Sequence, residues 1–364
     1  MVTGAVGPLR GSTGSGCGAG CDAGLDGLVG GQRSGAGGVV VMTDHGSREG
    51  SRGPLEKAVR LLTGVAPVLV DARDFLVGGP GRVRVGPGGV QLEVAGEGFV
   101  AKPEVLVVYE IPPADRGRLE VFAGALLVGG LLSLSADVRA WRNATDKRLT
   151  ARCFRRDGIA HMDTIALCRP EPQAAYEAFE RLGGDVWARP AVGAGGQDVF
   201  HLTTPDQVAA AVRHYAATGQ DWLMSRDAGN VNSEGRRHQF RVVVLGQRVL
   251  RVCELVQVNP DAPCNESQGA ISTVVAVEQF PVRYQRLAIA ATRSVGLPFG
   301  GVDLAVEHGG VIFEVNVHPT LDVPGGLESV AIPFVEAHLR THPEPHGGEQ
   351  TGNGKPRVGY QNRG

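Results

Sequence analysis

The residues that most clearly suggest chemistry lie near the carboxyl end of the chain. Asp303 and Glu314 are separated by a largely apolar segment that contains His308-Gly309. A two-residue turn at this dipeptide, which glycine favours, would place Asp303 opposite Glu314 on two antiparallel strands. Asn316 lies two residues after Glu314 and therefore projects from the same face of the hairpin.

Two carboxylates and an amide oxygen on one face are the hard ligands that Mg²⁺ prefers, with water and substrate phosphates completing its coordination. The opposite face is expected to pack on the core, because all its residues are apolar: Val302, Leu304, Val306, Val311, Phe313 and Val315. The alternative is a solvent-facing hairpin that binds nothing. Exposed hairpins usually carry Lys, Arg or Thr on the wet side and this face has none, so the pattern favours a metal site.

A glycine loop is the second feature with possible chemistry. An apolar strand ends at Arg189 and is followed by Gly193, Gly195 and Gly196. Backbone N–H groups of such a loop can surround phosphate oxygens, and the arginine can add charge-assisted contacts. The loop lacks the Gly-Lys-Ser/Thr of a P-loop and the helix of a dinucleotide fingerprint. Glycine loops also join strands without binding any ligand, so this motif alone is weak.

Three single residues complete the candidate site. Lys147 is a candidate phosphate ligand, and the alternative is a solvated lysine in the first turn of a helix. Arg241 begins an apolar strand, where it either caps the sheet edge or holds a substrate carboxylate or an acyl phosphate. Asn265 is a weaker candidate for the same role as Arg241.

The elements that must position these residues follow a mixed α/β pattern. Helices are predicted at residues 55–62, 118–128, 146–156, 173–182, 205–217 and 284–295. Strands are predicted at residues 67–70, 82–85, 90–94, 105–109, 186–189, 199–202, 241–245, 248–253, 302–306 and 311–315. Glycine-containing turns at residues 86–89 and 246–247 indicate two further hairpins.

The predicted organisation has four parts. Residues 1–41 contain 14 glycines and no hydrophobic period, so they are expected to be disordered. One hypothesis is that these residues are an artefact of start-site choice and that the chain begins at Met42. An N-terminal α/β domain is expected at residues 42–140, a larger domain at 141–340, and a disordered tail at 341–364 that is rich in Gly, Pro and His.

Composition excludes several functional classes. The 364 residues carry a formal net charge of −2, which gives no basic surface for nucleic acid. No apolar run approaches the roughly 18 residues needed to span a membrane, and no secretory signal is visible. Six cysteines occur without paired C-x-x-C motifs, so a reduced, cytoplasmic protein is the simplest interpretation.

The order of these features resembles the ATP-grasp superfamily, most closely the RimK-like glutamate ligases and related peptide ligases. The resemblance covers residues 141–339, and Arg189 stands where the family usually has lysine. It is carried by four stretches: Asn143-Ala144-Thr145-Asp146-Lys147 with Gly158-Ile159, Ala188-Arg189-Pro190 through Gly195-Gly196, Phe240-Arg241-Val242-Val243-Val244-Leu245-Gly246, and Gly301-Val302-Asp303 with Phe313-Glu314-Val315-Asn316-Val317-His318-Pro319.

The resemblance implies an α/β (α+β) fold in which an N-terminal α/β pre-ATP-grasp domain precedes an ATP-grasp domain of two subdomains. ATP would bind between these subdomains with Mg²⁺, or alternatively Mn²⁺. By resemblance, Mg²⁺ would be held by Asp303, Glu314 and Asn316, and the phosphates would be covered by Lys147, Arg189, Gly193, Gly195 and Gly196. Arg241 and Asn265 would face the reacting carboxylate.

The implied activity is ligation of a carboxylate to an amine through an acyl phosphate. The substrates would be small molecules or peptides, with no nucleic acid and no membrane involved, and a homo-oligomer is left open. Two alternatives remain: a small-molecule kinase of the same fold, and a non-catalytic nucleotide-binding protein. The fold alone does not separate these functions.

Overall fold

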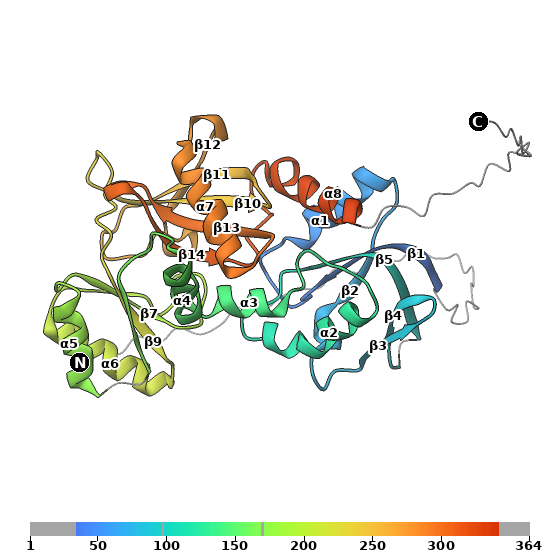
Figure 1. The fold of residues 1–364 in the computed structure, drawn as a ribbon, viewed down its shortest axis with the longest axis horizontal. Helices are drawn as coiled ribbons and strands as arrows, with labels where there is room; N and C mark the ends of the chain where they lie inside the picture. The colour runs from blue at the N-terminus through green and yellow to red at the C-terminus, as the bar shows by residue number, and fades with distance from the viewer. Residues whose placement is uncertain (1–33, 97, 169–170, 342–364) are drawn as a thin grey trace, which may run out of the picture.

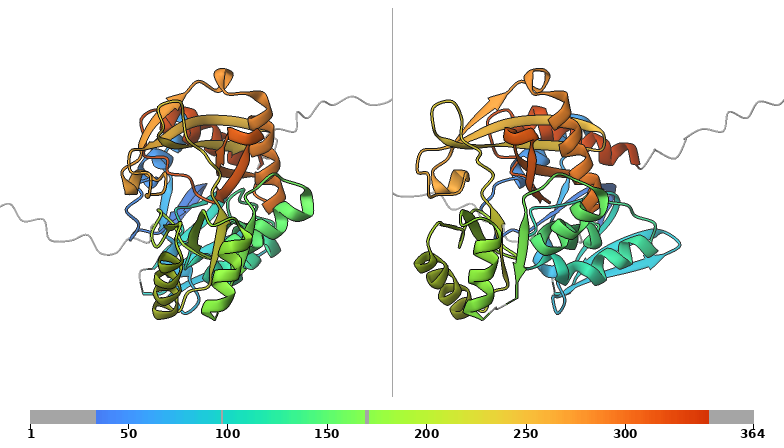
Figure 2. Two further views of the ribbon diagram at one scale, coloured as in Figure 1. Left: turned by 90° about the vertical axis from the view of Figure 1, so that its left-hand side faces the viewer. Right: turned by 60° about the vertical axis from the view of Figure 1, so that its left-hand side comes forward.

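The computed structural model describes residues 34–96, 98–168 and 171–341, which form three β-sheets with helices packed against them (Figure 1). One sheet lies in the N-terminal part of the chain, and the other two lie in the C-terminal part. The orange strands of residues 271–316 and the yellow-green helices of residues 172–218 occupy opposite ends of the C-terminal part in both views of Figure 2.

The N-terminal sheet has five strands in the order β2-β1-β5-β4-β3. Strand β1 pairs in parallel with β2 and with β5. Strand β4 pairs antiparallel with β3 and with β5. The elements are β1 (Ser34–Thr43), α1 (Arg52–Thr63), β2 (Val68–Asp71), η1 (Ala72–Phe75), β3 (Gly81–Gly86), β4 (Gly89–Val94), β5 (Phe99–Tyr109), η2 (Arg116–Leu119) and α2 (Glu120–Val128). The predicted hairpin at residues 86–89 is confirmed, because Val85 pairs with Val90.

The predicted disorder of residues 1–41 is wrong for residues 34–41, which belong to β1. This strand runs between two neighbours, and its partners include Val68 for Val40 and Val107 for Val41. Val40 and Val41 are buried. The high glycine content masked the short β-branched run that fills the strand. Residues 1–33 lie outside the described residues.

The second sheet has four antiparallel strands in the order β6-β9-β7-β8. Two helices that contact each other pack against it, and together they bury a separate core that includes Phe179, Tyr215 and Trp222. The elements are α4 (Lys147–Asp157), which precedes the sheet, β6 (Thr164–Leu167), α5 (Pro172–Arg181), β7 (Val186–Pro190), β8 (Phe200–Leu202), α6 (Pro205–Thr218) and β9 (Trp222–Arg226). Asp146 caps α4, because its side chain accepts a hydrogen bond from the Arg148 N–H.

The third sheet is antiparallel throughout, in the order β12-β11-β10-β13-β14. One face packs on α7, and the chain then returns so that α8 lies beside α1 of the N-terminal part (Figure 1). The elements are β10 (Arg237–Leu245), β11 (Arg248–Gln257), η3 (Glu266–Gln268), β12 (Ile271–Val275), η4 (Val277–Gln279), α7 (Val282–Val295), β13 (Phe299–Ala305), η5 (Glu307–Gly309), β14 (Val311–Asn316), η6 (Leu327–Ala331) and α8 (Ile332–Thr341).

The N-terminal sheet and the third sheet share their cores. One cluster contains Leu106 of β5, Val302 of β13 and Trp141, which lies on α3 (Val138–Thr145). A second cluster joins Tyr109 to Phe299 and Phe334. The predicted boundary between residues 140 and 141 falls inside α3, and the four-part division otherwise stays a prediction. Thr341 still belongs to α8, and the rest of the predicted tail lies outside the described residues.

Across the described ranges, no helix has the length and apolar character needed to cross a membrane.

A chain that begins at Met42 is expected to be less stable than one that begins at Ser34. The shorter chain loses most of β1, including buried Val40 and Val41. Burying a valine contributes about 1.5–3 kcal/mol, so the loss should lower the unfolding temperature of the N-terminal sheet by several degrees. Differential scanning calorimetry of the two truncations measures it. Equal unfolding temperatures would contradict the position of β1 in the core.

Candidate active site

The acidic hairpin has the pairing that the sequence predicts at its functional end. β13 and β14 place Asp303 opposite Glu314 and Gly301 opposite Asn316. The predicted two-residue turn is wrong, because residues 306–310 form the connection and contain η5. His308 has a positive φ of 50° there. Asp303 still pairs with Glu314, because a β-bulge between the loop and this pair compensates for the different loop length.

The bulge changes which residue faces the core. Beyond the Asp303–Glu314 pair, Leu304 pairs with Ile312, so Phe313 has no partner of its own. Ile312 is buried in the core that contains Leu304 and Val315, while Phe313 lines a cleft. The prediction that Phe313 packs on the core is therefore wrong. A bulge inserts one residue and reverses the alternation beyond it, and such irregularities often lie beside functional sites.

The Asp303 carboxylate is buried and held by Arg241 from the neighbouring strand. The Arg241 Nε and Nη2 atoms each lie 2.8 Å from one Asp303 oxygen. The Asn316 amide donates to Asp303 Oδ2 over 3.2 Å. Burial raises the pKa of Asp303 against the opposing effect of Arg241. The carboxylate in turn raises the pKa of Arg241. Arg241 is thus placed behind Asp303 as its fixed counter-ion.

Two cations surround Glu314 at longer range. Lys147 Nζ, at the start of α4, lies 3.5 Å from Glu314 Oε2, and Arg189 Nη1, on β7, lies 3.9 Å from it. Burial alone would raise the pKa of Glu314, but Lys147, Arg189 and Arg241 outweigh it and lower that pKa. Burial lowers the pKa of Lys147 and of Arg189. The region therefore concentrates positive charge around one carboxylate.

Both cations have hydrogen-bond donors besides those that face Glu314. Lys147 Nζ also donates to the Gly193 carbonyl over 3.1 Å, and Arg189 Nη2 donates to the Phe313 carbonyl over 3.2 Å. The buried Arg189 Nε has no hydrogen-bond partner within the described part of the chain. A buried donor without a partner costs free energy, so this group suggests an anionic ligand.

The glycine loop lies over the same groups. Gly195 and Gly196 have φ of 66° and 70°, a backbone conformation that residues with a side chain rarely adopt. A side chain at Gly196 would also meet Pro263 at 2.9 Å. The loop is tied across the cleft by Ser267, whose hydroxyl donates to the Gly195 carbonyl over 2.7 Å. These contacts bring the loop close to Asn265, which lines the cleft.

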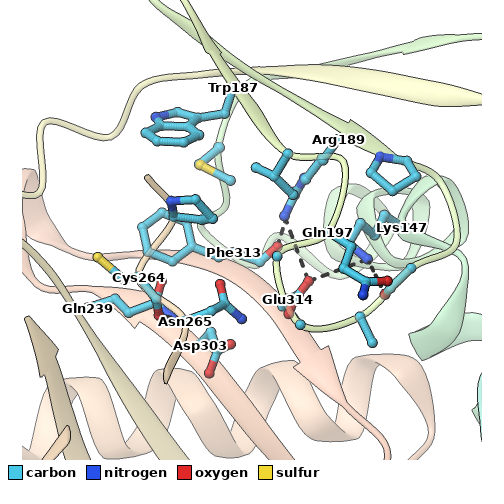
Figure 3. A pocket seen from close by; sticks show the side chains of 18 of the residues that line it. Lys147, Trp187, Arg189, Gln197, Gln239, Cys264, Asn265, Asp303, Phe313 and Glu314 are labelled. Atoms are coloured by element: carbon cyan, nitrogen blue, oxygen red, sulfur yellow. Dashed lines mark hydrogen bonds and ion pairs between the residues drawn. The ribbon is translucent and has the colours of Figure 1, made fainter. Parts of the chain in front are cut away.

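The cleft between the second and third sheets encloses about 790 Å³ of empty space, part of it open to solvent. Its lining combines apolar side chains with a few charged groups, which is typical of a small-molecule site. Figure 3 shows Lys147, Arg189 and Glu314 gathered at one end and Trp187 at the other. Of the predicted site residues, the lining includes Lys147, Arg189, Gly193, Gly195, Gly196, Asn265, Asp303 and Glu314. Arg241 and Asn316 reach the site through Asp303.

The end of the cleft around Trp187 was not assigned from the sequence. Met162, Trp187 and Phe313 give it an apolar wall. The Trp187 indole donates to Asp227 over 2.6 Å, and Arg237 binds the same carboxylate over 2.6 Å. Trp187 lies two residues before Arg189 on one strand, so alternation along that strand could have identified it. Nothing local to Met162 or Arg237 marks them as part of the site.

The donor set of the hairpin fits a hard divalent cation. Asp303 accepts three hydrogen bonds, which leaves one of its about four acceptor positions. Among the described residues, the ion pairs of Glu314 both involve Oε2, at 3.5 Å from Lys147 and 3.9 Å from Arg189. Asn316 directs its amide nitrogen at Asp303, so its carbonyl oxygen is left for another partner. These are the oxygen ligands that Mg²⁺ prefers.

Comparison with known proteins gives one curated relative and many similar structures. The relative is a probable alpha-L-glutamate ligase of Haemophilus ducreyi, 34% identical over 99 residues, or 27% of this chain and 30% of that protein. The chain thus matches less than a third of the length of this relative. No protein-family profile matches the chain.

Solved structures resemble the chain over most of its length. The ATP-grasp ligase PsnB complexed with minimal precursor has a TM-score of 0.60 at 16% identity, covering 83% of this chain and 98% of that one. PsnB with minimal precursor, Mg and ADP has a TM-score of 0.59 at 16% identity, over 84% and 98%. A RimK domain ATP-grasp protein from Sphaerobacter thermophilus has 0.56 at 17%, over 82% and 98%. The expected α/β ATP-grasp fold, with an α/β domain before it, is confirmed.

Removing the Arg241 side chain is expected to destabilise the protein through Asp303. Arg241→Met leaves a buried carboxylate without its counter-ion, which should cost about 3–5 kcal/mol of unfolding free energy. Adding Asp303→Asn removes that charge and should recover much of the loss. Urea denaturation monitored by tryptophan fluorescence measures both.

Arg84→Met is the matched control, because Arg84 pairs with Glu93 but its side chain is 71% exposed. It should change the unfolding free energy by less than about 1 kcal/mol. A double variant that is less stable than Arg241→Met alone would contradict the proposed charge pairing.

Proposed function

We propose that this protein is an ATP- and Mg²⁺-dependent ligase that joins a carboxylate to an amine through an acyl phosphate. The observation that carries the proposal is the convergence of Lys147, Arg189 and the glycine loop on Glu314, beside the buried Asp303, in one cleft. The ATP-grasp fold supports it. The relative named as a probable alpha-L-glutamate ligase and the PsnB ligase supply the reaction class by analogy.

The charge pattern sets the orientation of the nucleotide. The base would lie against Met162, Trp187 and Phe313, and the phosphates would extend toward Lys147 and Arg189. Gln239 also lines the cleft, where its amide donates to the Cys264 carbonyl over 3.0 Å and leaves its oxygen for a ligand hydroxyl. In this orientation the terminal phosphate reaches the acidic hairpin.

Phosphoryl transfer depends mainly on positioning and charge neutralisation rather than on a protein nucleophile. A substrate carboxylate oxygen would attack the γ-phosphorus as its bond to the ADP oxygen breaks. The amine would then displace phosphate, form the amide and release a proton. Lys147 and Arg189 would neutralise charge that develops on the transferred group.

Bound Mg²⁺ would supply further charge neutralisation at the phosphates, with Asp303, Glu314 and Asn316 as its protein ligands. Mn²⁺ is an alternative ion for the same oxygen donors. Arg241 would hold Asp303 in place, and its positive charge would lie behind that carboxylate near the reacting groups. Asn265, across the cleft, would face the reacting carboxylate.

The carboxylate and amine would be small molecules or peptide ends, and a cytoplasmic location and a homo-oligomeric state remain predictions. A kinase of this fold would use the same nucleotide site with an alcohol as acceptor. A purely binding protein would use it without turnover. The unpartnered, buried Nε atom of Arg189, within the described residues, favours a bound ligand, and the reaction products distinguish the three functions.

The variant Asp303→Asn with Glu314→Gln is expected to abolish Mg²⁺-dependent nucleotide binding. ATP with Mg²⁺ at 100 times Kd should stabilise the unaltered protein by about 2.7 kcal/mol. Thermal shift with ATP, in Mg²⁺ and in chelator, measures this. Glu93→Gln, far from the cleft, is the control. A Mg²⁺-dependent shift that persists in the double variant would remove these residues as ligands.

Hydroxylamine is expected to trap the proposed intermediate. Acyl phosphates react with it to give hydroxamates, so ATP, Mg²⁺, hydroxylamine and the correct acid should yield equal amounts of ADP and hydroxamate. A colorimetric hydroxamate assay across a panel of carboxylic acids provides the test. ADP release that needs an alcohol and gives a phosphate ester would instead establish a kinase. ATP binding without ADP release under any condition would leave only a binding protein.

A further inference from the structure

A second cavity lies next to the phosphate end of the nucleotide cleft. It encloses about 490 Å³ of empty space and shares Lys147, Gly193, Ala194 and Glu314 with the first cleft. Its other wall comes from the N-terminal part of the chain, where Glu49, Pro113 and Arg116 line it. A molecule in this cavity would therefore have one end beside the reacting phosphate and the other beside Arg116.

Arg116 is held in a fixed orientation at this wall. Its Nε atom donates to the Ile111 carbonyl over 3.0 Å, and its Nη1 atom donates to the Thr145 hydroxyl over 2.7 Å. A guanidinium group has five N–H donors. Within the described residues, these two bonds leave three donors of Arg116 without an assigned protein acceptor. The bonds that exist fix the plane of the group.

Arg116 also has no close counter-ion among the described residues. Within the described residues, no carboxylate lies within 4.0 Å of its guanidinium, although Glu49 of the same cavity interacts with it over a longer distance. Burial lowers the pKa of Arg116 to about 10, so the group stays protonated near neutral pH. A partly buried cation with free donors in a cavity wall is costly unless an anion joins it.

We propose that Arg116 binds a carboxylate of the substrate that does not itself react. This assignment rests on the proposed ligase function and makes the substrate class an acid-bearing molecule such as a free amino acid or the carboxyl end of a peptide. The planar, fork-shaped guanidinium matches a carboxylate through two parallel hydrogen bonds. The phosphate-binding groups lie at the shared end of the cavity, so a second phosphate is not needed at the Arg116 end.

The test compares acids with their amides in the presence of ADP and Mg²⁺. The probes are single amino acids and dipeptides, each paired with its C-terminal primary amide, and the readout is the thermal shift of the full chain. At least one acid should bind at least 10-fold more tightly than its amide. A response limited to dipeptides would identify a peptide end, and a response to single amino acids would identify free amino acids.

Two substitutions test whether Arg116 causes the preference for the acid over its amide. Arg116→Gln should abolish the preference for the acid while leaving binding of ADP unchanged, and Arg116→Lys should retain part of it. Arg118→Gln is the matched control, because Arg118 lies in the same short helix, pairs with Asp115 and has a side chain 54% exposed. Circular dichroism checks that each variant is folded.

The outcomes separate this inference from the ligase function. Equal binding of acids and amides across the panel, including no binding of either, would overturn the role of Arg116. So would a preference that survives in Arg116→Gln. Neither result affects the hydroxamate assay, which tests the ligase function. Conversely, the acid preference would stand even if the hydroxamate assay failed, because the thermal shift requires no turnover.

Discussion

The site depends on how the third sheet holds two carboxylates side by side, one buried and one at the wall of the cleft. Asp303 and Glu314 are adjacent across β13 and β14, and burying two like charges is unfavourable without nearby cations. The structure supplies these cations from different parts of the chain: Arg241 on β10 pairs with Asp303, and Lys147 and Arg189 lie beside Glu314. The hairpin, α4 and β7 are therefore coupled by charge as well as by packing. The tight pairing of Asp303 and the looser contacts of Glu314 also divide the two roles, one fixed and one open to exchange with a ligand.

Much of this arrangement was readable from local sequence. The hydrophobic alternation of residues 302–306 and 311–315 predicted both strands, and the facing of Asp303 and Glu314 is confirmed. The glycine loop and Lys147 also lie beside this pair; the resemblance to the ATP-grasp superfamily implied that placement, and the local signals alone did not. The predicted turn was wrong. A two-residue turn, or a five-residue loop with a bulge, would each place Asp303 opposite Glu314, and the sequence does not distinguish the two. Because the bulge is present, Phe313 faces the cleft and not the core.

Other features depend on tertiary contacts that no local pattern reveals. β1 lies in glycine-rich sequence and forms because β2 and β5 flank it. Arg116 lies in a short turn that resembles any exposed basic segment, yet the fold places it at a cavity wall shared with the C-terminal sheets. Trp187 and Arg237 are far apart in sequence, yet both bind Asp227, and the Arg237 guanidinium lies over the Trp187 ring. Local periodicity carries no information about such meetings.

The distribution of the cores bears on how the cleft works. The N-terminal sheet and the third sheet share two hydrophobic clusters, so Arg116 and the acidic hairpin belong to one continuously packed body. The second sheet has its own core, and it carries Arg189 and the glycine loop. At the site, hydrogen bonds connect it to the third sheet and its loops, among them Arg189 to the Phe313 carbonyl and Ser267 to the Gly195 carbonyl. Polar contacts of this kind are exchanged for ligand contacts at low cost, whereas a shared apolar core is not. Arg116, Lys147 and the acidic hairpin are thus built around the shared core, whereas Arg189 and the glycine loop belong to the sheet with a separate core.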